Sequence, residues 1–242
     1  MSPTMILSLV ASSMLVPWAT SQTIPIDAAP TEYPYAVRTS YVNIKGATNV
    51  AVGLAVSQRY LLASGFSKNS NNATGVELTD QQGVVHPVFS STPIGVSPFM
   101  FFKSCLIFNG PMFSLKAASF NNLSATINDA EVIYFTKDST VLKKIPVVIM
   151  NQTACETETD ETTAREQLCV EPNNTPDVCY NFFNTTLKLD QHPMVGIKGQ
   201  VHGSRYVLGC QDSSWVNVGK WYRFDAAIKD ITDIIPVVDL KD

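Results

Sequence analysis

The chain has 242 residues and a formal net charge of −4, from 17 basic and 21 acidic side chains. Hydrophobic residues make up 45% of it and charged residues only 16%. This apolar content excludes intrinsic disorder, and the length suffices for one domain or two packed halves. No basic cluster is present to neutralise phosphates, which argues against a nucleic-acid partner. No spacing typical of metal ligands occurs, so we expect neither a metal nor another cofactor.

The first residues have the pattern of a targeting segment. Met5 to Val16 is apolar except for three serines and is too short to span a bilayer. Ala19-Thr20-Ser21 places small residues three and one before a cut after Ser21. We therefore predict a signal peptide over residues 1–21 and a secreted, extracellular domain over residues 22–242. No later apolar run is long enough for a membrane span.

Potential N-glycosylation sites agree with export. Roughly two Asn-x-Ser/Thr triplets are expected by chance in such a chain, and an excess in an exported protein indicates that some carry glycans. The acceptor asparagines are Asn72, Asn122, Asn151, Asn173 and Asn184.

Beyond the targeting segment, short runs rich in Val, Ile, Leu, Tyr and Phe alternate with clusters of turn-forming residues. This pattern predicts an all-β sandwich or barrel. The clearest runs are Val50–Val56, Tyr60–Ala63, Pro98–Phe102, Ala130–Phe135, Ile145–Met150, Pro193–Ile197 and Ser204–Leu208. Phe224–Ile235 instead carries apolar residues at helical spacing and ends before Pro236, which predicts one C-terminal helix.

Five cysteines stand at positions 105, 155, 169, 179 and 210. In an oxidising compartment four of them should pair and one should be left over. Spacing alone does not assign the pairs.

Several segments resemble the trypsin/chymotrypsin-like serine proteases. Tyr33–Val37 and Val56–Ala63 are similar to the early Pro-Tyr strand of that family and to the segment leading to its catalytic His. Val195–Ile197 resembles the strand after the nucleophile loop, and Gly219–Arg223 resembles the segment before the terminal helix. The resemblance spans nearly all of the mature chain. It implies two packed six-stranded antiparallel β-barrels with a C-terminal helix.

The resemblance also implies which cysteines pair. Cys155 and Cys169 match one family disulfide, and Cys179 and Cys210 match the disulfide beside the nucleophile loop. Cys105 is then the odd cysteine. Because it follows an apolar strand, we favour a buried inert thiol over an intermolecular bridge. A further family disulfide is absent, since its two positions hold Ala51 and Ser67.

The positions that the resemblance assigns to catalysis carry unsuitable residues. Phe66 stands at the position of the general base and Phe183 at that of the serine nucleophile, and a phenyl ring performs neither role. Asn181 replaces a glycine that supplies an oxyanion N–H. No Asp or Glu occurs between Asp80 and Asp129, where the orienting Asp should lie. The three histidines, at 86, 192 and 202, all lie outside the segment of the general base, and we interpret them as structural or surface residues.

Three further features leave alternatives open. Asp177 matches the acid at the base of the family's specificity pocket, so it either attracts a basic side chain or is a vestigial, solvated residue. The acidic run Glu156–Glu161 contacts a basic partner or is simply a solvated face. A glycan on Asn184 would cover the former cleft if that site is occupied.

We therefore predict a secreted, non-catalytic serine protease homologue that acts by binding extracellular proteins. The candidate partners are a protease or another component of an extracellular proteolytic or immune cascade. The alternative is a structural or secretory-fluid glycoprotein with no protease-linked role. A third interpretation, an enzyme that uses unrelated residues, is disfavoured. The sequence leaves the oligomeric state open.

Overall fold

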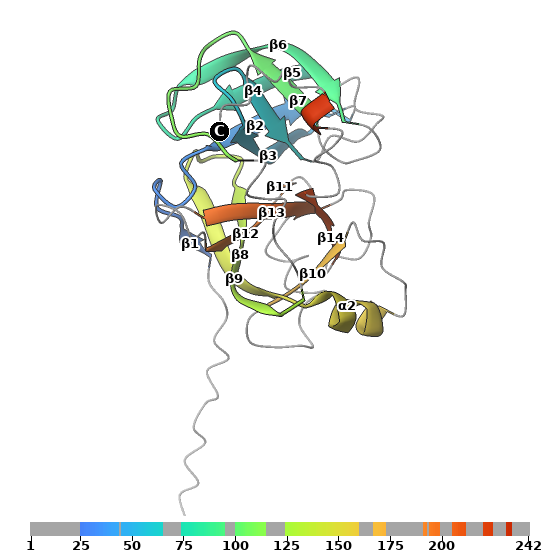
Figure 1. The fold of residues 1–242 in the computed structure, drawn as a ribbon. Helices are drawn as coiled ribbons and strands as arrows, with labels where there is room; N and C mark the ends of the chain where they lie inside the picture. The colour runs from blue at the N-terminus through green and yellow to red at the C-terminus, as the bar shows by residue number, and fades with distance from the viewer. Residues whose placement is uncertain are drawn as a thin grey trace, which may run out of the picture.

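The computed structural model describes residues 25–43, 45–64, 74–94, 100–114, 124–159, 167–172, 191–192, 194–198, 205–211, 220–224 and 231–233. Two β-sheets lie one above the other, with the short strand β11 near their junction (Figure 1). Apart from β11, the upper sheet comes from the first half of the chain, and apart from β1 the lower sheet comes from the second half.

The upper sheet forms the first barrel. Its seven strands are joined in the order β11-β3-β2-β5-β6-β7-β4, and an additional β3–β4 pairing closes all of them except β11 into a ring. β11 is parallel to β3 and pairs with it at Val50 and Ala51. The strands are β2 (Ala36–Val42), β3 (Thr48–Ala55), β4 (Tyr60–Ala63), β5 (Thr74–Thr79), β6 (Val85–Pro93), β7 (Met100–Ser104) and β11 (Gln191–His192).

The lower sheet forms the second barrel. Its seven strands run in the order β1-β9-β10-β14-β13-β12-β8, and an additional β9–β8 pairing closes all of them except β1. β1 adds to the outer edge of β9. The strands are β1 (Ile26–Asp27), β8 (Ile127–Phe135), β9 (Leu142–Ile149), β10 (Gln167–Pro172), β12 (Met194–Lys198), β13 (Arg205–Gln211) and β14 (Lys220–Arg223).

Alternating burial explains why these segments form strands. In β2 the side chains of Val37, Thr39 and Tyr41 are buried. The residues on the other face, Arg38, Ser40 and Val42, are partly exposed. In β9 every second residue from Ile145 to Ile149 is buried. A period of two residues places one row of side chains inside a barrel and the other row outside it.

Three apolar clusters fill the fold. Leu61, Leu78 and Phe102 belong to the cluster inside the first barrel, and Val147 and Trp221 to the cluster inside the second. The largest cluster takes residues from both barrels and lies between them; its members include Leu54, Phe101, Ile133, Met194 and Phe224. The predicted pair of packed six-stranded barrels is confirmed.

One of the two helical segments was predicted from the sequence and the other was not. The backbone is helical at Phe224 and over residues 231–233, and both Phe224 and Ile231 are fully buried. This agrees with the predicted terminal helix, whose remaining residues lie outside the described ranges. The helix α2 (Gln152–Thr159) follows β9 and was not expected from the sequence.

Candidate functional site

Most positions that the sequence assigns to a site lie outside the described residues. They include Phe66, Asp177, Asn181 and Phe183, together with Cys179. β4 leads toward the general-base position, and Ser64, the last described residue before it, is buried with a side-chain oxygen that has no hydrogen-bond partner. The assignments of Phe66 and Phe183 therefore stay predictions from the sequence.

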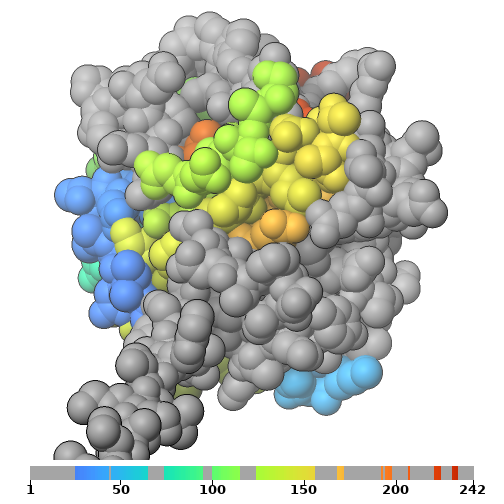
Figure 2. Space-filling view, turned by 90° about the horizontal axis from the view of Figure 1, so that it is seen from below, coloured from blue at the N-terminus to red at the C-terminus, as the bar shows by residue number. Residues whose placement is uncertain are grey.

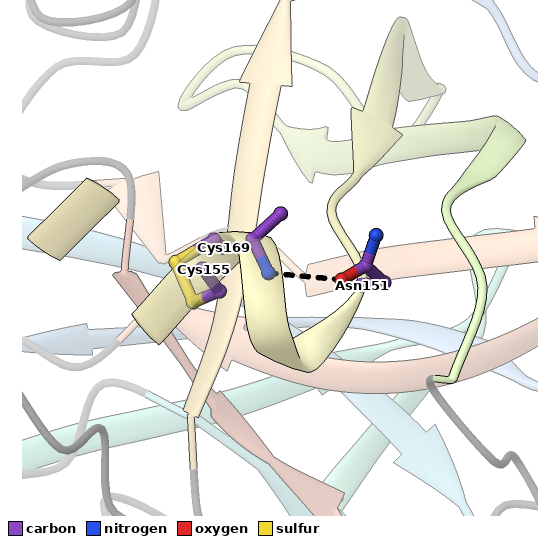
Figure 3. Close-up of a disulfide and its surroundings, with 4 residues drawn as sticks. Asn151, Cys155 and Cys169 are labelled. Atoms are coloured by element: carbon purple, nitrogen blue, oxygen red, sulfur yellow. Dashed lines mark hydrogen bonds between the residues drawn. A yellow bond between two sulfur atoms is a disulfide. The ribbon is translucent and has the colours of Figure 1, made fainter. Parts of the chain in front are cut away.

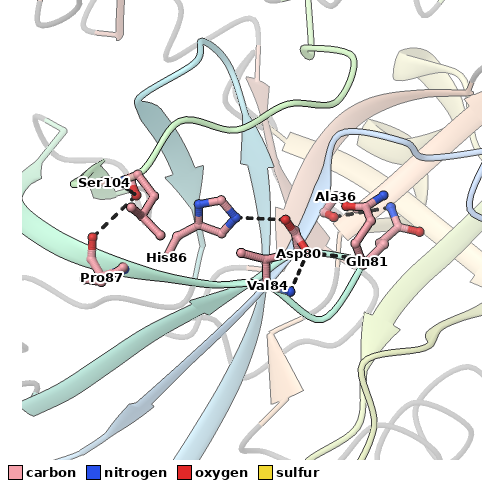
Figure 4. A network of polar contacts seen from close by, with 9 residues as sticks. Ala36, Asp80, Gln81, Val84, His86, Pro87 and Ser104 are labelled. Carbon is pink, nitrogen blue, oxygen red and sulfur yellow. Dashed lines mark hydrogen bonds and ion pairs between the residues drawn. The ribbon is translucent and has the colours of Figure 1, made fainter.

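His86 is held in a polar cluster at the β5–β6 turn (Figure 4). Its Nε2 lies 2.8 Å from Oδ2 of Asp80, and its ring stacks on Phe108 with centroids 4.3 Å apart. The other carboxylate oxygen of Asp80 accepts the backbone N–H groups of Gln82 and Val84 at 3.0 and 2.8 Å. The buried Nδ1 of His86 has no hydrogen-bond partner. This histidine is therefore bonded to the turn, and no hydroxyl is among its described partners.

The residues of this turn form a recognisable sequence signature, although the turn was not predicted from the sequence. Asp80 precedes Gly83, whose φ of 81° lies in the left-handed region that favours glycine. Asp at the start of a turn and glycine three residues later are the residues that such a turn requires. The hairpin explains the bond from Asp80 to His86. β5 and β6 pair on either side of the turn, and this brings His86 of β6 back beside Asp80 at the end of β5.

His192 lies in a second cluster, between strand β11 and the first barrel. Tyr41 Oη and Asn49 Nδ2 each lie 3.2 Å from His192 Nε2, and Asn49 also donates to Tyr41 Oη at 3.1 Å. Burial raises the pKa of Tyr41, and the hydrogen bond from Asn49 lowers it in part. The phenol is therefore protonated at neutral pH. This cluster fastens β11 to β2 and β3, and its hydroxyl is a phenol rather than an alcohol nucleophile.

A third buried cluster joins the N-terminal segment to the second barrel. The hydroxyl of Tyr33, which is fully buried, donates to Glu131 Oε1 at 2.8 Å. Lys144 Nζ lies 3.8 Å from Glu131 Oε2 and 2.5 Å from Glu32 Oε1. A Cβ added at Gly196 would lie 2.3 Å from the Tyr33 hydroxyl oxygen, so only glycine leaves room for this ring. These groups fix how the chain passes from one barrel to the other.

The N-terminal strand is also bonded along its length. Ile26 and Asp27 pair with Lys144 and Lys143 of β9, and Asp27 forms an ion pair with Lys143. The Ala28 N–H donates to the carbonyl of Leu142 at 2.8 Å. Figure 2 shows this segment, in blue, at the surface beside the lime-to-yellow residues of β8 and β9.

Arg38 also connects the two barrels. Its guanidinium donates to the carbonyls of Lys137 and Thr136 at 2.6 and 3.5 Å. Burial lowers the pKa of Arg38, while Glu77 and Asp138 raise it. Arg38 is the first basic residue of the chain and lies within β2, so its peptide bond is part of a barrel strand.

The predicted disulfide between Cys155 and Cys169 is present. It joins α2 to β10 with a Cα–Cα distance of 5.6 Å, and both residues are buried (Figure 3). The second predicted pair is not described, because Cys179 and the side chain of Cys210 lie outside the described part of the structure. The same applies to most of the acidic run Glu156–Glu161, of which only the helical backbone through Thr159 is described.

Asn151, one of the predicted glycan acceptors, begins α2. Its Oδ1 accepts the Ala154 N–H at 2.9 Å, which is the bond of a helix N-cap (Figure 3). Its Nδ2 donates to Thr126 Oγ1 at 3.3 Å. Asparagine is a preferred N-cap residue, so Asn151 is the sequence signal that could have marked the start of α2. The other four acceptor asparagines lie outside the described residues.

The structure corrects the expectation for Cys105, whose thiol is exposed and unpaired. β7 ends with Ser104 fully buried, so the alternation of a strand places the next side chain outward. The Cys105 N–H still donates to Pro87 O at 2.9 Å, which keeps the backbone beside β6. The apolar run before Cys105 indicated burial, but the phase of the strand decides it.

Within the described ranges, no three His, Cys, Asp or Glu side chains converge as the ligands of a metal ion would. Among the described helices, none has the length and apolar character needed to cross a membrane.

Comparison with known proteins places the fold. No family model and no curated protein matches the sequence. The VesB protease of Vibrio cholerae is similar in structure with a TM-score of 0.60 at 12% identity, over 87% of this chain. This chain spans 66% of the length of the VesB chain.

Two shorter structures match along nearly their whole length. GrC (granzyme C) has a TM-score of 0.54 at 13% identity, and the scabies mite inactivated protease paralogue S-I1 has 0.56 at 9% identity. Each match covers 86% of this chain and 97% of the other. The chain therefore has the two-barrel fold of the trypsin-like serine proteases.

Proposed function

We propose that this chain is a secreted, non-catalytic homologue of the trypsin-like serine proteases and that it acts by binding other extracellular proteins. The observation that carries the proposal is the pair Phe66 and Phe183 at the positions of the general base and the nucleophile. Loss of such groups costs on the order of 10⁶ in kcat, roughly 8 kcal/mol of transition-state stabilisation.

The two described histidines support this proposal. His86 is bonded to the turn-forming Asp80, and His192 is bonded to a phenol and an amide. A substitute catalytic centre would need an imidazole beside an alcohol or thiol, with N–H groups directed at the oxyanion. Among the described contacts, neither of these two clusters supplies that combination.

The N-terminal segment supports the absence of an activation step. The resemblance implies that active family members are cut after a basic residue to free a new amino terminus. The first basic residue here is Arg38, inside β2, where it pairs with Val52 of β3 and Thr79 of β5. A cut there would break a barrel strand, and the preceding segment is bonded to β9. We infer that the chain functions without such processing.

One compared structure is described as an inactivated protease paralogue, from the scabies mite. We extend this description to the present chain as part of the proposal. Secretion rests on the predicted signal peptide at residues 1–21, and it agrees with the Cys155–Cys169 disulfide, which is typical of oxidising compartments.

An activity-based fluorophosphonate probe tests the inactive assignment, because it labels activated serine nucleophiles covalently. The full secreted chain should show no labelling above its heat-denatured control, under conditions that label trypsin completely. Labelling that is lost on denaturation would falsify the assignment. His86→Ala and His192→Gln variants would then show whether either imidazole takes part.

The alternative function, a structural or secretory-fluid glycoprotein, differs in its partners. Affinity capture from the native fluid followed by mass spectrometry separates the two. Enrichment of proteases, inhibitors or cascade proteins over a capture with an unrelated glycoprotein favours the binding role, and their absence favours the structural role. A variant with Glu156, Glu158, Asp160 and Glu161 changed to Gln or Asn tests the acidic run, and unchanged capture would exclude it as the contact.

A further inference from the structure

Asn109 is directly followed by a glycine, and the pair lies in an exposed connection. Asn109 and Gly110 come after strand β7, in a stretch that is neither helix nor strand, and both are exposed. Every other asparagine of the sequence is followed by a residue with a side chain. Glycine has no Cβ, so its backbone nitrogen is unshielded and its dihedral angles are the least restricted. This pair is therefore the place where a backbone nitrogen most easily reaches the side chain that precedes it.

The structure leaves both reacting groups accessible. Within the described part of the chain, no hydrogen bond reaches the side-chain amide of Asn109 or the backbone N–H of Gly110. A Cβ built at Gly110 would have one neighbour within 4 Å, the carbonyl oxygen of Pro34 at 3.4 Å, so the space around this residue is open. No described contact has to break before the Gly110 nitrogen can approach Cγ of Asn109.

The connection is anchored on both sides of the pair. Phe108 is buried, and its N–H donates to the carbonyl of Gln58 at 2.8 Å. Phe113 is also buried, and its N–H donates to the carbonyl of Ala55 at 2.8 Å. The residues between these two phenylalanines form a short span that is held at both ends. A change of the backbone at Asn109 is therefore confined to this span, and the strands on either side keep their pairing.

We propose that Asn109 is a site of spontaneous chemical modification, at which the Gly110 nitrogen displaces the side-chain amide and the residue converts to isoaspartate and aspartate. The proposal goes beyond the proposed function and depends on neither secretion nor the loss of catalysis. The product carries a carboxylate in a stretch where the sequence has no acidic residue between Asp80 and Asp129. The formal net charge of −4 becomes more negative by one unit.

The reaction needs only water and a base such as hydroxide. The base removes the Gly110 amide proton, the nitrogen attacks Cγ of Asn109, the Cγ–Nδ2 bond breaks, and ammonia leaves. The product is a cyclic imide, which water opens at one of its two carbonyl carbons. Opening at Cγ gives aspartate, and opening at the backbone carbonyl gives isoaspartate, in which the chain runs through Cγ. One water is consumed and one ammonia is released, so no oxidant or reductant takes part.

Asn49 provides an internal control within the same barrel. Its Oδ1 accepts the side-chain amide of Asn43 at 3.0 Å, and its Nδ2 donates to the Tyr41 hydroxyl at 3.1 Å. The next residue, Val50, is β-branched and pairs with Ser40 in the β2–β3 ladder. The same cyclisation would have to break these side-chain bonds and distort a barrel strand. We therefore expect Asn49 to stay intact while the exposed pair reacts.

The test is a time course of the full secreted chain at body temperature and mildly alkaline pH, in water labelled with a heavy oxygen isotope. Peptide mapping by mass spectrometry should show that the Asn109 peptide exchanges an NH group for one labelled oxygen, whereas the Asn49 peptide is unchanged. Isoaspartyl methyltransferase, which methylates the free α-carboxylate of isoaspartate, should label the Asn109 peptide only. A synthetic peptide with the sequence Leu106–Phe113 serves as the unfolded reference, and its rate should lie within several-fold of the rate in the protein.

Two variants test the mechanism. Gly110→Ala adds a methyl group beside the attacking nitrogen and should slow the conversion many-fold, and the open space at this position accommodates the methyl group. Asn109→Gln is the matched control for the side chain, because it keeps the amide but requires a larger ring, and it should show no conversion over the same period.

Three results would overturn the proposal. They are an Asn109 that stays unmodified while the synthetic peptide converts, conversion at Asn49 as fast as at Asn109, and an unchanged rate in Gly110→Ala. None of them alters the outcome of the fluorophosphonate experiment, so this proposal and the non-catalytic assignment fail or succeed separately.

Discussion

Replacing Gly196 by alanine tests the packing between the N-terminal segment and the second barrel. The added Cβ would lie 2.3 Å from the Tyr33 hydroxyl oxygen and 2.8 Å from Cε1 of that ring, closer than atoms pack. Tyr33 is fully buried and donates to the buried carboxylate of Glu131, so the ring has no open space to enter. The ring must move, and its hydrogen bond lengthens or breaks.

The cost has two parts. Overpacking a core by one methyl group costs about 1–3 kcal/mol, and loss of a hydrogen bond to a charged group costs about 1.5–3 kcal/mol. Replacing a strand glycine returns about 0.5–1 kcal/mol, so we expect the free energy of unfolding to fall by about 2–5 kcal/mol. For a chain of this length that lowers Tm by roughly 10 °C.

Urea unfolding followed by tryptophan fluorescence measures this change. Gly110→Ala is the control, because its Cβ would have one neighbour, the carbonyl of Pro34, at 3.4 Å; we expect a change within about 0.5 kcal/mol. In a chain that already carries Tyr33→Leu, the cost of Gly196→Ala should shrink by at least half, since the clashing hydroxyl and ring are gone. An unchanged midpoint for Gly196→Ala, or an equal cost in both backgrounds, would refute the steric explanation.

Three further predictions concern stability. Changing Cys155 and Cys169 together to Ser should lower the free energy of unfolding by about 3 kcal/mol, the value for a loop of about 15 residues. An unchanged free energy in urea unfolding would contradict the idea that the disulfide stabilises the fold by restricting the unfolded chain. Asn151→Ala should lower the free energy of unfolding by about 1 kcal/mol through loss of the helix N-cap, whereas Asn151→Asp keeps the cap but also removes the glycan acceptor, so equal losses in the two variants would point to the glycan instead. The pKa of Tyr41 is raised on folding, so its contribution is fully present below the unfolded pKa of about 10 and is lost as the pH rises toward the folded pKa. Urea midpoints between pH 8 and 11 should therefore fall less steeply for Tyr41→Phe, and parallel curves would exclude this residue.

Some of the fold follows from local patterns. Short apolar runs between turn-forming clusters predicted strands at Val50–Val56, Tyr60–Ala63 and Ala130–Phe135, and the structure has β3, β4 and β8 there. β6 was not predicted, because most of its residues are exposed and it lacks a regular apolar alternation. α2 was missed because its sequence, QTACETET, has no apolar stripe, so its start is marked by the cap alone.

Part of the candidate site could also be predicted from the sequence, and the rest required the structure. The phenyl rings at positions 66 and 183 are a chemical fact of the sequence, and their assignment to a base and a nucleophile comes from the family resemblance. The clusters around His86 and His192 required coordinates. The bond between Tyr41 and His192 joins residues 151 positions apart, and no local pattern encodes such a pairing.

The amino-acid sequence alone determined which side chains can do chemistry and in which order apolar and polar residues alternate, because both are local properties. From them follow the β-strands. The pairing of Cys155 with Cys169, and the prediction that Phe66 and Phe183 stand at the positions of a base and a nucleophile, came from the family resemblance. Only the tertiary structure decided that Cys105 faces solvent, since the phase of a strand depends on which of its faces meets a core. It also decided that Tyr33 reaches Glu131 across 98 positions of the chain, because that contact exists only once two closed barrels pack against each other.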